Sequence, residues 1–301
     1  MRRPDDSTLT PQQRTRVLKE AERALLEAQA MGVFPTPVDQ ILAVANVREE
    51  ETELDEGLIS RMRSKAGSAL KRALSKVIGL FHASAGIIFL DHTLHKIKKR
   101  FVRLHEAGHG FLPWQRPMYA VVEDCEKALD PEAADLFDRE ANVFASEVLF
   151  QLDTFREMAE SKPFGIFVPV RLAPKFDASI YASVRQYVSK NSRACAVVVL
   201  NMPELVRGDG FRASLRRAVQ SPTFTATFGA HQWSESYTPD DDIGAMIPVG
   251  GRRASGKRHI VLVDADDRRH ECIAEAFTQT HQVFVLILVS KALASARIVV
   301  R

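Results

Sequence analysis

The sequence lacks the features that mark secreted and membrane proteins. Its three cysteines are widely spaced in 301 residues, and such an odd set forms no disulfide framework. The first residues carry charge but no following apolar segment, so they do not form a secretory signal. The longest apolar runs, 194–200 and 283–289, are far too short to cross a bilayer. These absences predict a cytoplasmic protein without membrane segments.

The chain also lacks a strong excess of either charge. Its formal net charge is +3, from 41 Lys and Arg against 38 Asp and Glu, which is too weak to indicate a nucleic-acid-binding protein. Hydrophobic residues make up 46% and charged residues 26%, as in ordinary globular proteins. The length suffices for one large or two ordinary domains.

The clearest chemical pattern is H-E-x-x-H, formed by His105, Glu106 and His109 on a short helix expected at 101–110. Positions i and i+4 lie on the same face of a helix, so both imidazoles can bind one zinc ion. Glu106 can then take a proton from water held by that ion. A helix with two unrelated histidines is the simpler alternative, so other parts of the chain must decide.

A second helix, expected at 131–150, provides a carboxylate. Its apolar residues recur at three- and four-residue spacing, and Glu140 lies on the same face. Burying a carboxylate is costly unless it is paired or binds a metal, so Glu140 is the candidate third ligand. Two histidines and one carboxylate leave zinc a position for water, as in catalytic sites. Leu112 and Gln115 exclude the extended pattern with a third histidine.

The two motifs together resemble the ImmA/IrrE family of metallopeptidases, in which H-E-x-x-H is followed by E-A-N-x-F-A. Here the second motif runs from Glu140 to Ala145, and the resemblance covers about residues 17–203. Phe150 departs from the family, which usually has Met and Pro at the end of this helix. The resemblance implies a zinc endopeptidase that cleaves a partner repressor with an XRE-type helix-turn-helix. Cleavage would release transcription of stress-response, mobile-element or phage-defence genes.

The expected fold is α+β. Helices at 11–29, 38–44 and 59–74 and a hairpin of 77–81 with 86–90 precede the H-E-x-x-H helix, which suits a small zincin-like core. Thr36 is the expected cap of the second helix. A helical appendix at 155–190 follows. Its helix-turn-helix pattern at 172–188 carries few basic groups, which favours a helical pair that packs on the peptidase and helps line its cleft over one that reads DNA. Residues 1–192 are therefore expected to form the first domain.

Residues 193–301 are expected to form a second α+β domain. Apolar and β-branched runs predict strands at 196–200, 259–263, 271–278, 283–289 and 298–300. Helices are expected at 211–219 and 290–296. The family resemblance implies a GAF-like sensor domain at this end of the chain.

Several single residues are further candidates for the zinc site. Cys125 lies between His109 and Glu140, and its thiolate could occupy the fourth zinc position and keep the enzyme latent. A cysteine without a role is the alternative. A developing oxyanion also needs a donor, and the candidates are Tyr119, His92 and His231.

Two basic segments complete the set of candidates. Hydrated surface is their simpler interpretation, and contact with nucleic-acid phosphate, with single-stranded DNA as an activator, is the alternative. They comprise Lys96, Lys98, Lys99 and Arg100 before the motif, and Arg252, Arg253, Lys257 and Arg258 in a glycine-rich loop. A DNA-binding regulator with a structural zinc site is the alternative function. The oligomeric state is not predicted.

Overall fold

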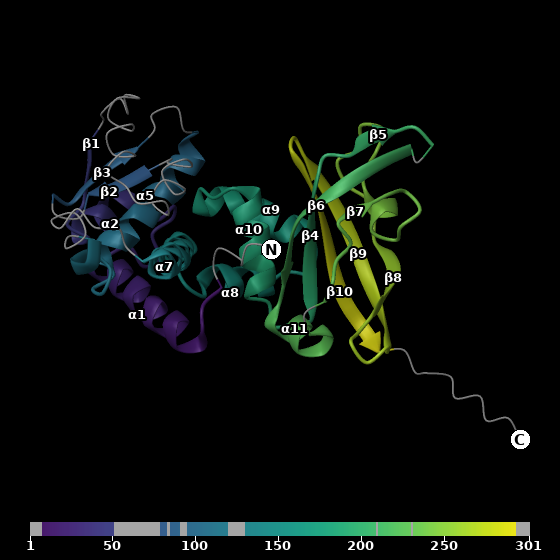
Figure 1. Ribbon diagram of the computed structural model, residues 1–301, viewed down its shortest axis with the longest axis horizontal. Helices are drawn as coiled ribbons and strands as arrows, with labels where there is room; N and C mark the ends of the chain where they lie inside the picture. Colours follow the sequence, from purple (N-terminus) through teal and green to yellow (C-terminus); the bar gives the residue numbers. More distant parts are fainter. Residues whose placement is uncertain are drawn as a thin grey trace, which may run out of the picture. The chain divides into compact units, whose positions relative to one another are not determined.

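The computed structural model describes residues 8–50, 79–82, 85–90, 95–119, 130–208, 210–229 and 231–292. The chain forms two compact units, Met1–Phe155 with Ala173–Ser179, and Arg156–Leu172 with Ile180–Arg301. The first unit is mainly helical and the second contains a curled antiparallel sheet, so the predicted α+β class is confirmed (Figure 1). The expected helix at 59–74 and strand at 298–300 lie outside the described residues.

Four helices frame the first unit: α1 (Pro11–Glu27), α2 (Val38–Val44), α5 (Lys96–Phe111) and α7 (Pro131–Leu149). Helix α1 begins where predicted, because the Thr10 hydroxyl accepts a hydrogen bond from the Gln13 backbone and Pro11 suits the first turn. Its buried stripe of Val17, Ala21 and Leu25 forms the face by which the helix packs on α7.

A small sheet leads into the motif helix. Strand β2 (Gly79–His82) pairs antiparallel with β3 (Ile87–Leu90), which confirms the predicted hairpin. Strand β1 (Arg48–Glu50) runs parallel to β3 on its other side. The expected cap of α2 is wrong, since the Thr36 hydroxyl donates to the Val148 carbonyl oxygen at 3.2 Å instead.

Helices α5 and α7 approach each other closely at Gly108. A Cβ atom at this position would lie 3.1 Å from Cδ1 of Phe144 and 3.3 Å from Cα of Ala141. Such distances are tighter than ordinary van der Waals contact, so only glycine fits without movement of α7. The glycine inside the H-E-x-x-H motif therefore sets the spacing between the two helices.

The second unit is built on an antiparallel sheet. Its strand order is β5-β6-β4-β10-β9-β8, and β7 (Ser236–Tyr237) pairs with β6. Helix α11 (Pro222–Phe228) and the 3-10 turn η2 (Gly244–Met246) complete the core on one face. The strand bounds are β4 (Cys195–Asn201), β5 (Glu204–Val206), β6 (Gly210–Gln220), β8 (Arg258–Val263), β9 (Arg269–Gln279) and β10 (Gln282–Ala292).

The helical appendix consists of α8 (Thr154–Glu160), α9 (Phe167–Leu172), the 3-10 helix η1 (Ala173–Phe176) and α10 (Ile180–Ser189). Helix α10 buries Val184, Tyr187 and Val188 and packs against β4 and β6. The second helix of the helix-turn-helix pattern therefore packs on the sheet of the second unit, and not on the peptidase core as expected. The compact units place 156–172 and 180–192 with the sheet, a division that differs from the predicted 1–192 and 193–301.

The predicted helix at 211–219 is wrong, because these residues belong to the long strand β6. Phe211, Leu215 and Val219 fit a helical spacing, and the segment is rich in Ala, Arg and Leu, which favour helices. Pairing with β4 and β5 overrides that local preference. The expected helix at 290–296 is also wrong for residues 290–292, which continue β10.

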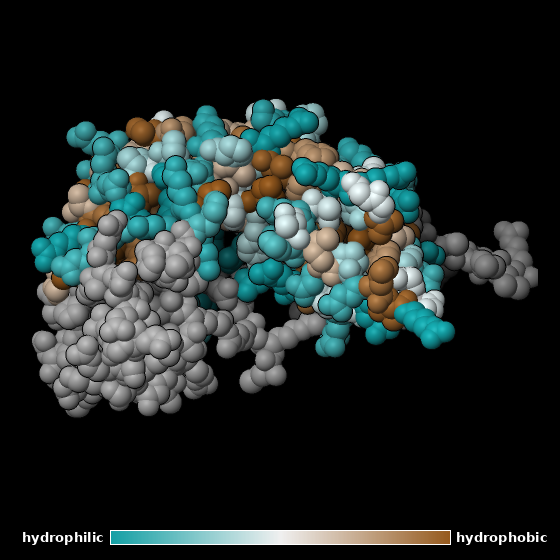
Figure 2. Space-filling view, turned by 90° about the horizontal axis from the view of Figure 1, so that it is seen from above, coloured by the Kyte–Doolittle hydropathy of each residue, from teal (hydrophilic) through white to brown (hydrophobic). Residues whose placement is uncertain are grey.

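The surface shown in Figure 2 is largely hydrophilic, with hydrophobic side chains in small groups. Within the described ranges, no helix has the length and apolar character needed to span a membrane.

Candidate metal centre

The two histidines of the motif converge on one point. One turn of α5 separates His105 from His109, and their Nε2 atoms lie 3.2 Å apart. The third group is Asp138 of α7, whose Oδ1 lies 3.4 Å from Nε2 of His105. Ligand atoms of the three residues all lie within 4.8 Å of one another.

Side-chain amides hold both imidazoles from behind. Nδ1 of His105 lies 3.1 Å from Oδ1 of Asn142, and Nδ1 of His109 lies 2.7 Å from Oε1 of Gln115. The amide nitrogens are turned the other way, since Asn142 donates to Asp138 and Gln115 donates to Glu140. Both imidazoles must therefore donate through Nδ1, which leaves a lone pair on each Nε2.

This arrangement fits a divalent cation. With both imidazoles neutral, two nitrogen lone pairs and a carboxylate oxygen face one another, so they repel unless a cation lies among them. Two imidazole ligands about 2.05 Å from a tetrahedral ion are separated by roughly 3.3 Å, close to the 3.2 Å between the Nε2 atoms. The donor set of two histidines and one carboxylate is that of catalytic metal sites with an open position.

The structure corrects the choice of Glu140 as the third ligand. Its carboxylate is fully buried, as the sequence predicts, but on the far side of α7 from Asp138. Arg16 of α1 contacts Oε1 at 2.5 Å, and Trp114 and Gln115 each donate to Oε2 at 2.7 Å. The Arg16 guanidinium also stacks over the Trp114 ring, 3.8 Å from its centroid. These partners stabilise the buried carboxylate of Glu140 without a metal ion.

Glu106 has the surroundings expected of a proton acceptor. Its side chain is buried beside the two histidines, and burial raises the pKa of its carboxyl to about 7, although the charge of His105 opposes this. Burial is the largest effect on the pKa of His105 and lowers it, but the hydrogen bond to Asp138 and the negative charges of Glu106 and Asp138 together outweigh burial, so the net shift is upward. Burial and the positive charge of His105 lower the pKa of His109.

Comparison with known proteins identifies the region that contains this group. Residues 62–184 match the Peptidase_M78 family model, described as the IrrE N-terminal-like domain. The chain carries an IrrE-like domain. The expected resemblance is confirmed, and this domain includes α5, α7 and all three candidate ligands. The bounds of the match leave helix α1, and with it Arg16, outside the IrrE-like domain.

Among solved structures, a Mycobacterium tuberculosis transcriptional regulator is similar, with a TM-score of 0.49 and 12% sequence identity. The alignment covers 93% of this chain and 82% of that chain. No curated protein matches the chain.

The structure describes two of the three candidate oxyanion donors, Tyr119 and His231. Tyr119 lies beside the metal group of the IrrE-like domain, its ring 5.1 Å from that of His109, and burial raises the pKa of its hydroxyl. His231 belongs to the second unit and packs against the rings of Phe228 and Trp233. His92 and Cys125 lie outside the described residues.

Most of the basic side chains on α5 are engaged in ion pairs. Lys99 pairs with Glu49 at 2.5 Å, and Arg100 pairs with Asp177 at 3.3 Å. Lys96 and Lys98 are exposed and have no side-chain partner in the described part of the chain. These ion pairs favour the interpretation of this segment as the hydrated surface of a helix. The described residues leave two lysines at its start without a partner.

The four basic residues of the glycine-rich loop likewise divide into two with partners and two without a side-chain partner among the described residues. Lys257 lies 3.5 Å from Glu275, and Arg258 donates to the Ala245 carbonyl oxygen at 3.3 Å. Arg252 and Arg253 are exposed, and the described residues offer them no side-chain partner.

Sequence reasoning missed Asp138, Asn142 and Gln115. A signal for the first two was present, because residues four apart share one face of a helix. Glu140 stands two positions from each, so it must point to the opposite face. Gln115 lies beyond the end of α5, and no local pattern relates it to His109.

Proposed function

We propose that the IrrE-like domain is a zinc-dependent endopeptidase. The observation that carries this proposal is the convergence of His105, His109 and Asp138, with the buried Glu106 beside them. One zinc ion per chain, held by these three side chains, would supply the Lewis acidity that acidifies water and polarises a peptide carbonyl.

The chain's own residues supply the remaining steps. Glu106 accepts the proton of the attacking water and passes it to the leaving amine, a role that suits a carboxyl whose pKa is raised to about 7. Asn142 and Gln115 keep both imidazoles in the tautomer that binds a metal through Nε2. Tyr119, whose ring lies 5.1 Å from that of His109, is the proposed hydrogen-bond donor to the developing oxyanion.

The proposed substrate is a partner repressor with an XRE-type helix-turn-helix, whose cleavage releases stress-response or phage-defence genes. The paired motifs and the IrrE-like domain support this choice. Such a substrate also places the enzyme in the cytoplasm.

The test is co-expression with the repressor encoded beside this gene, followed by detection of the cleaved repressor. Wild type should cleave, and Glu106→Gln should lower the rate by about 10²–10⁴-fold, the range typical of a lost general base. Glu22→Gln, an exposed change on α1, is the control and should cleave as wild type does. Cleavage that persists unchanged in Glu106→Gln would reject the mechanism.

We further propose that single-stranded DNA activates cleavage. The exposed cations Lys96, Lys98, Arg252 and Arg253 support this, because free cations attract phosphate. Addition of a single-stranded oligonucleotide should raise the cleavage rate, and the effect should decline with added salt. A rate that does not respond to the oligonucleotide would contradict this part of the proposal.

The alternative is a DNA-binding regulator whose zinc is only structural. The packing of α10 against β4 and β6 speaks against it, since a helix that reads DNA needs a free face. A repressor left intact after incubation with zinc, together with sequence-specific binding of duplex DNA, would favour this alternative.

A further inference from the structure

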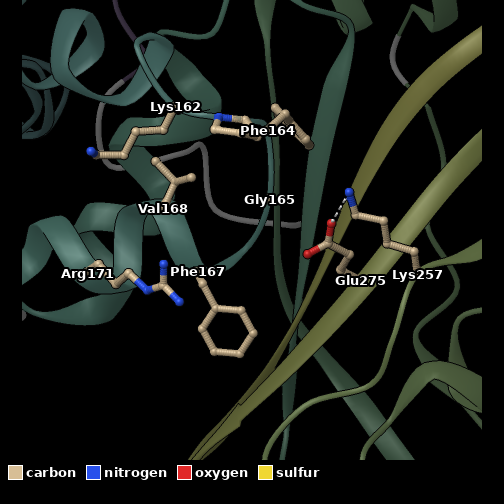
Figure 3. Close-up of a pocket in the computed structure, with 9 residues that line it drawn as sticks. Lys162, Phe164, Gly165, Phe167, Val168, Arg171, Lys257 and Glu275 are labelled. Carbon is tan, nitrogen blue, oxygen red and sulfur yellow. Dashed lines mark ion pairs between the residues drawn. The ribbon is translucent and has the colours of Figure 1, made fainter.

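The second unit contains a cavity that lies outside the metal centre. Its volume is about 400 Å³, and it is formed by the segment before α9, by α9 itself, by the loop before β8 and by strand β9. A cavity of this size falls within the range that holds a small organic molecule. Figure 3 shows Phe167 and Arg171 on one side of it and Glu275 with Lys257 on the other.

Two aromatic rings give the cavity an apolar wall. Phe167 is 38% exposed, which is unusual for a phenylalanine, and its ring packs edge-on against Phe277 at 5.7 Å. Phe164 packs against Tyr187 with ring centroids 5.3 Å apart. Both rings are therefore held by neighbours while part of their surface stays open to a ligand.

The charged groups around the cavity are mainly positive. Lys162, Arg171 and Lys257 line it together with one acid, Glu275. Lys257 lies 3.5 Å from Glu275, whereas Lys162 and Arg171 have no ion-pair partner in the part of the chain that the structure describes. A guanidinium beside exposed aromatic surface is suited to a carboxylate or phosphate carried on a flat ring.

Glu275 of β9 binds the backbone of the segment before α9. Its Oε2 accepts a hydrogen bond from the Ile166 backbone at 3.2 Å. A Cβ at Gly165 would lie 3.3 Å and 3.4 Å from the two carboxylate oxygens, so the backbone passes unusually close to them. This contact ties the segment before α9 to β9, and Phe164 and Phe167 on either side gain fixed positions.

From these observations we propose that this cavity binds a small anion with a flat ring, namely a nucleoside monophosphate or an aromatic carboxylate. Arg171 binds the anionic group, with Lys162 adding positive charge. Phe167 and Phe164 contact the ring. Residues 162–171 of the lining fall within the IrrE-like match, but the lining includes no candidate metal ligand, so the proposal holds whether or not the metal centre is that of a peptidase.

The test is isothermal titration calorimetry on the full-length chain. The probes are AMP and indole-3-carboxylate, which combine a ring with an anion, and adenosine and inorganic phosphate, which each have one part only. One of the two ring-bearing anions should bind with a submillimolar Kd, and the comparison between them distinguishes the two sources. Arg171→Gln and Phe167→Ala should each weaken that binding by at least about tenfold, or 1.4 kcal/mol.

Two controls define the outcome. Arg216→Gln, which removes an exposed arginine away from the cavity lining, should bind as wild type does, and so should Asp138→Asn, which alters the metal centre. Binding lost in Asp138→Asn but kept in Arg171→Gln would place the ligand at the metal centre and overturn the proposal. Binding of neither ring-bearing anion, or equal binding of phosphate alone, would also overturn it.

Discussion

Gln115 donates a hydrogen bond to the buried carboxylate of Glu140 at 2.7 Å and presents its oxygen to Nδ1 of His109 at the same distance. A carboxylate can only accept, so Glu140 determines which end of the Gln115 amide faces the imidazole. The acid predicted to bind the metal instead fixes the tautomer of a histidine that can bind it.

The first prediction separates the roles of the two acids on α7. Asp138→Ala should remove a ligand and nearly abolish zinc binding. Glu140→Gln should keep one zinc ion per chain but lower its affinity by about 10–100-fold, as loss of a partner behind a metal ligand does. Competition with a chromogenic chelator measures both affinities. The reverse order of effects would restore Glu140 as a ligand.

The second prediction concerns the stability gained from the metal. An ion that binds only the folded state at 100 times its Kd stabilises that state by about 2.7 kcal/mol. Zinc should therefore raise the thermal unfolding midpoint of the first unit, and a chelator should reverse the rise. Differential scanning calorimetry of wild type and Asp138→Ala checks this, and an equal shift in the variant would show that zinc acts elsewhere.

The third prediction tests the contact between α5 and α7. Gly108→Val should clash with Phe144 and Ala141 and destabilise the first unit by about 1–3 kcal/mol through overpacking. It should also weaken zinc binding, since the ligands come from both helices. Gly256→Val is a matched control, because no atom lies within 4 Å of its added Cβ, and it should change stability by less than about 0.5 kcal/mol. Chemical denaturation measures both variants.

The fourth prediction concerns acid stability of the second unit. His270 lies 2.8 Å from Asp264, and this hydrogen bond lowers the pKa of the Asp264 carboxyl. A lowered pKa adds stability above the value of the unfolded chain, about 3.9, and that stability is lost as the pH falls through the folded value. Asp264→Asn should make the unfolding midpoint depend less on pH below about 4. Thermal unfolding between acid and neutral pH checks this, and equal slopes would contradict it.

Local patterns predicted the parts of the fold that depend on neighbouring residues. The stripe of α1, the amphipathic α7 and the β2–β3 hairpin follow from spacing and turn residues. Strand β6 does not, because its partners β4 and β5 decide its conformation. The H-E-x-x-H motif likewise predicted the histidine pair but not the side-chain amides that face the two Nδ1 atoms.

Burial of a carboxylate does not by itself identify the third metal ligand. A buried carboxylate can be stabilised by a metal or by hydrogen-bonding and cationic side chains, and sequence does not distinguish the two. Here Arg16 reaches Glu140 across 124 positions of the chain, a contact that no local pattern reports. Spacing along α7 was the better guide, since it places Asp138 with Asn142.

Helix α1 has a practical consequence for work with fragments. A fragment limited to residues 62–184 would contain every candidate metal ligand but would lose Arg16 and Arg14, the partners of the buried Glu140 and Glu147. It would also uncover the apolar side of α7 that α1 shields. A fragment that keeps these contacts must therefore include α1 and its cap Thr10, far upstream of the residues that match the family model.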